Sequence, residues 1–237
     1  MKKNKTIWIL GWMWPWASAE MYMKIIRYCQ HEYWAVQDDD YPQIIINSLT
    51  LDWFNETWIV DDELVKSQLI EWVKILEKSW SDLIIIACNT VHIFYKDIKE
   101  SVNVPIFNIV EETKNELIKN SYKKVWILSS QSTRDFWLYR KLLEKNNICV
   151  VTTNKEQQNN ANKVIENVMG WNQNQNDTIA LKRIINNMVK EWADAIVLWC
   201  TELPLAINQI HTDHVLFDTM DILVKKSVDF SLDKNMK

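Results

Sequence analysis

The chain has 237 residues, of which 48% are hydrophobic and 24% charged, and its formal net charge is −4. This is the balance of an ordinary folded protein, so disordered, collagen-like and coiled-coil chains are excluded, and the length fits one large domain or two small ones. The lysines are scattered along the chain. Because nucleic acid requires a basic stripe, we expect no nucleic-acid partner and a small-molecule substrate. The apolar run near the N-terminus is too short for a signal peptide or a membrane span, which predicts a cytoplasmic protein.

Short apolar runs rich in β-branched residues alternate with longer amphipathic segments along the whole chain. The runs predict strands at residues 7–10, 44–48, 83–87, 106–108, 125–129, 148–151, 195–198 and 215–217. Apolar residues spaced by three and four predict helices at 17–31, 61–78, 111–120, 133–146 and 178–191. The acidic run 38–40 predicts a solvated loop, and the asparagine-rich segment 154–176 a helix and a mobile loop. This alternation is typical of βαβ units around a mostly parallel sheet, so the predicted fold class is α/β.

The chain also repeats itself. KTIWIL at 5–10 resembles KKVWIL at 123–128, and WSDLIIIACNT at 80–90 resembles WADAIVLWCTE at 192–202. The two matches keep the same order and similar offsets, from Trp8 to Trp126 and from Cys88 to Cys200. We therefore predict two similar α/β halves, each with a mostly parallel sheet flanked by helices, and an active site in the cleft between them. The expected bounds are 1–115 with Cys88 and 116–217 with Cys200, and a helix over 218–231 can pack back on the first half.

Two of the four cysteines, Cys88 and Cys200, follow the carboxyl ends of equivalent predicted strands. Ligands of open α/β sheets bind at these strand ends, and nearby helix N-termini lower the pKa of a thiol towards neutrality. One cysteine can then act as a thiolate base while the other stays protonated. An opposed acid and base of this kind is what racemisation at a carbon atom requires. The sequence leaves open which cysteine is the resting thiolate.

Polar residues accompany both thiols. Asn89, Thr90 and Thr201 can donate hydrogen bonds to a substrate carboxylate and stabilise charge as a carbanion forms. Glu202 can orient the Cys200 thiol or simply favour a helix N-terminus. His92 can tune Cys88 or simply cap its helix. We expect Cys88 and Cys200 to be the catalytic residues, and Asn89, Thr90, Thr201 and Glu202 to bind the substrate.

The remaining cysteines predict no further chemistry. Cys29 and Cys149 stand without such neighbours and are interpreted as structural, because cysteine is among the most buried residue types. Neither paired CxxC motifs nor an HExxH motif occurs, so the thiols are expected to be reduced and no metal is expected.

The glycine and tryptophan contents are abnormal: the chain has 2 glycines and 14 tryptophans, whereas about 7% glycine, roughly sixteen residues, is usual. The tryptophans stand where glycine's access to positive φ is normally needed. Trp12 and Trp14 lie in a tight loop between a strand and a helix, Trp34 follows a helix, and Trp80 and Trp192 lie between a helix and a strand. We hypothesise that the gene comes from a lineage that reads UGA as glycine and that UGA is written here as tryptophan. The mass of the native protein tests this, and fourteen indoles would refute it.

With tryptophan returned to glycine, three motifs resemble those of the aspartate/glutamate racemase family. Residues 9–15, ILGWMWP, resemble the family's GGMGP opening, residues 87–92, ACNTVH, resemble ACNTAH, and residues 199–204, WCTELP, resemble GCTE[IL]P. The resemblance runs from Thr6 to about Phe230. It implies two similar α/β domains with the site between them, two-cysteine racemisation without a cofactor, and a homodimer. By position it implies a substrate pocket lined by Met13, Ser48, Asn89, Thr90, Thr133 and Thr201.

Departures from the family pattern bear on the substrate. Many aspartate-specific members carry an Asp-Arg-Thr stretch after the second strand, whose arginine can hold a side-chain carboxylate. Residues 51–54 of this chain are LDWF, so that arginine is missing. A family lysine is replaced by Met169, and Ser132 stands where glycine is usual. Aspartate or glutamate is the leading prediction, and a broader range of amino acids stays open. The alternatives are another isomerase or a decarboxylase on the same scaffold, or a catalytically silent amino-acid-binding protein.

Overall fold

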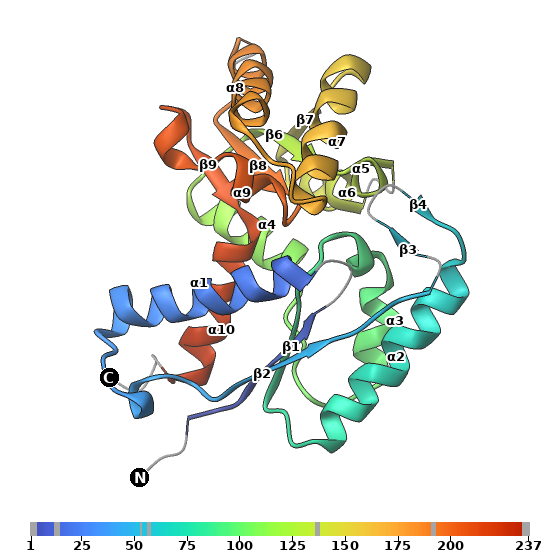
Figure 1. Ribbon diagram of the computed structural model, residues 1–237, viewed down its shortest axis with the longest axis vertical. Coiled ribbons are helices and arrows are strands. Elements are labelled where there is room, and N and C mark those ends of the chain that lie inside the picture. The colour runs from blue at the N-terminus through green and yellow to red at the C-terminus, as the bar shows by residue number, and fades with distance from the viewer. Residues whose placement is uncertain are drawn as a thin grey trace. The chain divides into compact units, whose positions relative to one another are not determined.

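The computed structural model describes residues 4–11, 15–52, 54–55, 58–135, 138–190 and 193–233. Its contacts divide the chain into two compact units (Figure 1). Unit 1 comprises Met1–Asn55, Ile59–Glu112 and Met220–Lys237, and unit 2 comprises Glu56–Trp58 and Thr113–Thr219. Each unit is built around its own parallel sheet and is described by itself.

Unit 1 contains a three-stranded parallel sheet in the order β2 (Ile44–Ser48), β1 (Ile7–Gly11), β5 (Leu83–Ile86). Helices α2 (Asp62–Lys78) and α3 (Tyr95–Glu100) lie on one side of this sheet, and α1 (Pro15–Tyr33) and α10 (Thr219–Ser231) lie on the other (Figure 1). A short hairpin, β3 (Phe54–Asn55) and β4 (Trp58–Ile59), precedes α2. Helix α4 (Ile109–Lys119) begins in unit 1 and continues into unit 2.

The core of unit 1 follows from two sequence periodicities. Alternate strand residues, among them Leu10, Ile84 and Ile86, point to the side of α2 and α3. The apolar face of α2 meets them with residues spaced by three and four, namely Val65, Leu69, Val73 and Leu76. Burying side chains of this size stabilises the fold by about 1.5–3 kcal/mol each.

Unit 2 contains a four-stranded parallel sheet in the order β7 (Cys149–Thr152), β6 (Lys124–Ser129), β8 (Ala195–Trp199), β9 (Leu216–Asp218). Its helices are α5 (Gln131–Asp135), α6 (Leu138–Lys145), α7 (Lys155–Met169), α8 (Gln175–Val189) and the short α9 (Leu203–Ala206). The strand pairing of unit 1 recurs here, because Trp8 pairs with Ile84 in unit 1 and the matching Trp126 pairs with Ile196 in unit 2. The α/β class with two similar parallel sheets is therefore confirmed.

The main differences between the predicted and the observed elements are the following. Residues 106–108 form an isolated bridge, Ile84 to Ile106, because the Asn108 side chain already accepts from Val110 N at 2.9 Å and starts α4. The helix expected at 133–146 is found as α5 and α6, and residues 136–137 lie outside the described part of the chain. The acidic run forms a 3₁₀ turn, Asp38–Asp40, in which the Asp40 carboxylate accepts from Val36 N and Gln37 N. Helix α3 and the hairpin were not expected, since both are short.

Three tryptophans occupy the left-handed backbone conformation directly after a helix. The φ angles of Trp34, Trp80 and Trp171 are 58°, 62° and 59°, and their exposed fractions are 82%, 89% and 70%. At Trp171 the backbone bonds from Trp171 N to Val168 O and from Asn172 N to Asn167 O form the helix-ending pattern that glycine favours. The backbone therefore supports the hypothesis that these positions belong to glycine.

Three tryptophans within strands support the same hypothesis, that tryptophan stands at glycine positions. The indole N–H groups of Trp8, Trp126 and Trp199 are buried and find no hydrogen-bond partner within the described residues. A buried donor left unpaired costs about 1–3 kcal/mol. The ring centroid of Trp199 also lies 3.8 Å from that of Tyr139, closer than the roughly 4.5–7 Å preferred by aromatic pairs. Glycine at these positions would remove both costs.

Replacing Trp34, Trp80 or Trp171 by glycine is expected to raise the free energy of unfolding by about 1 kcal/mol each, because a side chain in the left-handed region costs about 1–2 kcal/mol. Urea unfolding monitored by circular dichroism measures this. Trp72→Gly is the control, since Trp72 lies within α2 and packs against the core, so this change should destabilise the protein. Destabilisation by all four changes would contradict the interpretation of the helix ends.

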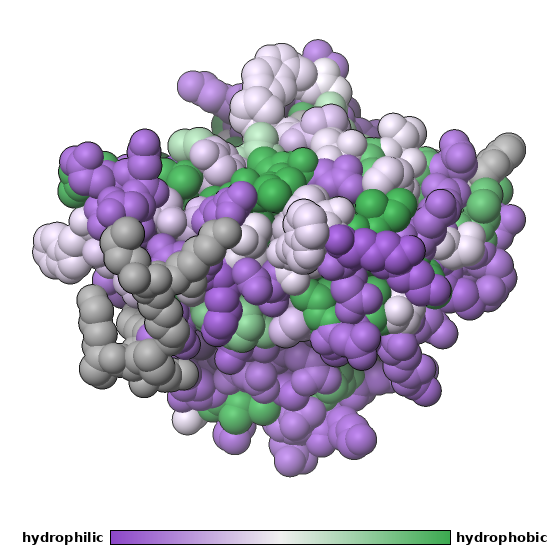
Figure 2. Space-filling model, turned by 90° about the horizontal axis from the view of Figure 1, so that it is seen from below, coloured by the Kyte–Doolittle hydropathy of each residue, from purple (hydrophilic) through white to green (hydrophobic). Residues whose placement is uncertain are grey.

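Within the described residues, the model has no helix long and apolar enough to span a membrane. On the face seen in Figure 2, hydrophobic residues form separate islands among hydrophilic ones. Isolated exposed apolar residues are normal on protein surfaces. This face alone therefore indicates no large apolar interface.

Candidate active site

Cys88 lies in unit 1, two residues beyond the end of β5. The preceding residue is bonded to the neighbouring strand, from Ala87 N to Leu10 O at 3.1 Å, and a 3₁₀ helix, Thr90–Phe94, follows. The thiol is buried, with 2% of the residue exposed, and it packs against the apolar cluster between the sheet and α2. Asn89 and Thr90 are buried beside it. The site around Cys88 thus combines apolar walls with polar groups at the strand end.

His92 is fixed between the Cys88 loop and α4. Its Nδ1 lies 2.7 Å from the carbonyl oxygen of Cys88, and its Nε2 accepts from Ile109 N at 3.5 Å. A carbonyl can only accept, so Nδ1 carries the proton and the ring is neutral. Burial lowers the pKa of His92 from 6.5 to about 4, against the opposing effect of its hydrogen bonds. His92 therefore holds the backbone of Cys88 as a neutral ring, and it is not protonated near pH 7.

Cys200 follows β8 in unit 2 and donates a hydrogen bond to a buried carboxylate. The distance from Cys200 Sγ to Glu202 Oε2 is 2.8 Å, and Thr201 Oγ1 donates to the same oxygen at 2.9 Å. All three residues are at least 96% buried. Of the two roles that the sequence left open for Glu202, the contacts support orientation of the thiol.

The Glu202 carboxyl has an elevated pKa. Burial raises it, and the hydrogen bonds from Cys200 and Thr201 oppose that effect. A buried carboxyl with a raised pKa holds a proton more readily than an exposed carboxyl does.

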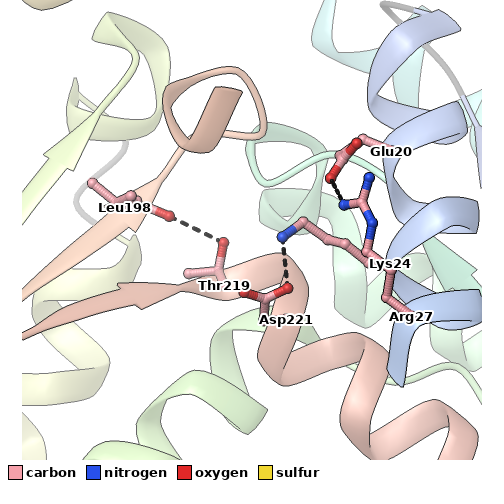
Figure 3. Close-up of polar contacts among 6 residues, drawn as sticks. All are labelled: Glu20, Lys24, Arg27, Leu198, Thr219 and Asp221. Atoms are coloured by element: carbon pink, nitrogen blue, oxygen red, sulfur yellow. Dashed lines mark hydrogen bonds and ion pairs between the residues drawn. The ribbon is translucent and has the colours of Figure 1, made fainter. Parts of the chain in front are cut away.

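The strand before Cys200 is tied to the start of α10. Thr219 Oγ1 donates to the carbonyl oxygen of Leu198 at 3.2 Å, and both groups are buried (Figure 3). Further along α10, Asp221 accepts from Lys24 Nζ of α1 at 2.6 Å within unit 1. The bond from Thr219 holds the end of β8 two residues before the thiol.

Two further residues expected at the site, Ser48 and Thr133, lie at or just beyond the carboxyl ends of strands, each in its own unit. Ser48 ends β2 and pairs with Gly11 at the end of β1. Thr133 is buried in α5, where Ser130 Oγ donates to Thr133 Oγ1 at 3.1 Å. Met13 lies outside the described residues. The structure brings Cys200, Thr201 and Glu202 into direct contact and places Cys88, Asn89 and Thr90 on one loop. The expected meeting of the two groups across a cleft stays a prediction.

Sequence reasoning missed several residues near Thr133. A cavity of about 100 Å³ lies at the ends of β6 and β7 and is lined by Thr133 together with Arg134, Asp135, Tyr139 and Arg140. Gln158 of α7 fixes the end of β6, because its Nε2 donates to Ser129 O at 2.9 Å. The available signal was the run of polar residues directly after a buried strand.

The comparisons with known proteins agree with this geometry. The sequence model of the family described as "Asp/Glu/Hydantoin racemase" matches residues 9–227. The broad specificity amino-acid racemase RacX of Bacillus subtilis (strain 168) is 33% identical over 220 residues, which cover 93% of this chain and 95% of RacX. The crystal structure of an aspartate racemase homologue from Pyrococcus horikoshii OT3 superimposes with a TM-score of 0.81 at 29% identity, covering 98% and 100% of the two chains. The Picrophilus torridus aspartate racemase shares the fold with a TM-score of 0.76 at 24% identity, covering 95% and 94%.

The fold is thus that of a racemase with two α/β halves. The chain belongs to the Asp/Glu/hydantoin racemase family and is an amino-acid racemase.

Proposed function

We propose that this racemase inverts an acidic amino acid, aspartate or glutamate, without a cofactor, and that Cys88 and Cys200 exchange the proton of the α-carbon. The observation that carries the proposal is the duplicated position of the thiols. Cys88 follows Ile84 by four residues, Cys200 follows Ile196 by four, and these two isoleucines occupy the same pairing position in their sheets. Two equivalent acid–base groups suit a reaction whose substrate and product are mirror images.

The proposed reaction moves one proton in each half-step. A thiolate removes the proton from the α-carbon, so the C–H bond breaks, an S–H bond forms and a carbanion remains. The opposite thiol then donates its proton to the other face, which leaves a thiolate on that side. The roles reverse for the other enantiomer, and no electrons are gained or lost. Buried hydrogen-bond donors beside the thiols, Asn89, Thr90 and Thr201, would stabilise the negative charge of the intermediate.

Glu202 would act on the thiol rather than on the substrate. Its carboxylate accepts the Cys200 S–H at 2.8 Å, which orients the thiol and can hold its proton between turnovers. The sequence predicts Glu202 as a substrate-binding residue. Its hydrogen bond with Cys200 favours a role in positioning the thiol instead.

The proposal also covers the range of substrates, the oligomeric state and the cellular location. The family resemblance supports an acidic amino acid, whereas RacX is described as having broad specificity. The homodimer and the cytoplasmic location expected from the sequence stay predictions.

Polarimetry or chiral chromatography of single L- and D-amino acids tests the proposal. Aspartate or glutamate should be racemised in both directions, and activity should survive dialysis against a metal chelator and a carbonyl reagent that traps pyridoxal phosphate. Calorimetric binding of aspartate and glutamate without turnover of either would refute the proposed substrates. Turnover abolished by the carbonyl reagent would refute cofactor independence.

A further inference from the structure

The cavity in unit 2 lies at the ends of two parallel strands and has both polar and apolar walls. Ser129 and Thr152 are the last residues of β6 and β7, and Ile127 of β6 lies across from Thr152 in the strand register. Thr133 and Arg134 of α5 also line the cavity. The Ser129 hydroxyl already donates to Ser130 O at 3.1 Å, whereas the Thr152 hydroxyl can donate to a ligand, and the volume of about 100 Å³ accepts a group the size of a carboxylate.

The charged residues that line the cavity leave one guanidinium without an ionic partner. Arg140 pairs with Glu144, Nε to Oε1 at 2.6 Å. Both carboxylate oxygens of Asp135 accept from Gln131 Nε2, at 2.9 and 2.8 Å. Arg134 is partly buried and forms no ion pair with any residue that the structure describes. Because Glu144 already pairs with Arg140, Arg134 is the guanidinium of the lining that has no ion-pair partner among the described residues. Arg134 can therefore pair with a singly charged anion.

The cavity is close to the Cys200 end of unit 2. Ser129 is the register partner of Trp199, the residue before Cys200, and Tyr139 of the cavity wall contacts the Trp199 ring. Adjacent strands lie about 4.8 Å apart. The cavity and the Cys200 thiol thus lie at the ends of neighbouring strands of the same sheet.

We propose that this cavity binds the side-chain carboxylate of the substrate and that Arg134 determines specificity for acidic amino acids. The inference rests on the proposed function, because it requires the α-carbon to be at Cys200. Arginine presents a fixed pair of N–H donors that match a carboxylate. The hydroxyl groups of Thr133 and Ser129 complete its surroundings.

Calorimetry tests the cavity without requiring turnover. Glutarate, a dicarboxylate, and butyrate, its singly charged counterpart, are titrated into the wild type, Arg134→Met, Arg134→Lys and the control Arg183→Met, whose arginine is exposed on α8. The wild type and the control should bind glutarate roughly 10- to 100-fold more tightly than butyrate, as expected for one charge-assisted contact. Arg134→Met should lose that preference and Arg134→Lys should retain part of it. Equal binding of both probes by the wild type, or an unchanged preference in Arg134→Met, would overturn the proposal.

Kinetics then separate specificity from folding. Arg134→Met should raise KM for glutamate roughly 10- to 100-fold, Arg134→Lys should recover part of that loss, and the control Arg183→Met should keep the wild-type KM. A fall in kcat of Arg134→Met with an unchanged KM would assign Arg134 a structural role and contradict the inference. A wild type that racemises no amino acid refutes the proposed function, while the calorimetric comparison still decides whether Arg134 binds a carboxylate.

Discussion

Replacing either Cys88 or Cys200 by serine is expected to lower kcat/KM for racemisation by on the order of 10³, because a positioned acid or base contributes about 10² to 10⁴. Serine keeps the shape of the side chain but is a far weaker acid than a thiol. In the proposed mechanism both thiols act in every turnover, one to remove the proton and the other to deliver it. Each single variant should therefore be nearly as inactive as the double variant, and initial rates in both directions measure this.

Cys149→Ser is the matched control, since Cys149 is an exposed thiol at the start of β7. It should retain wild-type activity. Thermal unfolding of each variant shows whether a loss of activity reflects a loss of the fold. A folded Cys88→Ser or Cys200→Ser protein with more than a tenth of wild-type activity would contradict two-thiol catalysis.

Glu202→Gln is expected to lower kcat by about 10² and to stabilise the protein at alkaline pH. Glutamine keeps an oxygen that can accept the Cys200 S–H but cannot take its proton. Burial raises the pKa of the Glu202 carboxyl in the folded state above its unfolded value. The folded state therefore binds the proton more tightly, and wild-type stability falls as the pH rises from the unfolded pKa, about 4.3, through the folded one. The neutral amide lacks this dependence.

The melting temperatures of wild type and Glu202→Gln at pH 5 and pH 8 measure this effect. The advantage of the variant should be larger at pH 8 than at pH 5, because the raised pKa of the wild-type carboxyl makes the stability of the wild type fall as the pH rises. Glu100→Gln is the control, because Glu100 is exposed on α3 with only a distant contact to Lys96. Equal melting temperatures of wild type and Glu202→Gln at both pH values, together with an unchanged kcat, would contradict the role proposed for Glu202.

The predictable part of the fold was the part with strong periodicity. β1, β5, β6 and β8 are largely buried parallel strands, and continuous apolar runs identify them. The internal repeat predicted two similar sheets because the same residues pair in each. Residues 106–108 were predicted wrongly as a strand because a composition signal cannot show that Asn108 caps a helix instead. Helix α3 is too short to leave a periodic signal.

The candidate site was predictable only where residues are close in sequence. Cys200, Thr201 and Glu202 are consecutive, so their contact was within reach of the sequence. The bond between His92 and the carbonyl of Cys88 spans one helical turn, but the contact with Ile109 depends on how α4 begins. The cavity around Arg134 joins two strands and two helices, and only the fold assembles it.

Racemisation in D₂O, followed over the first few per cent of conversion, tests the two-thiol claim most directly. Starting from L-glutamate, the account predicts that the D-glutamate product carries one solvent deuterium at the α-carbon while the remaining L-glutamate stays unlabelled, because different groups remove and deliver the proton. Deuterium appearing equally early in the recovered substrate and in the product would mean that one group does both, and would contradict the account.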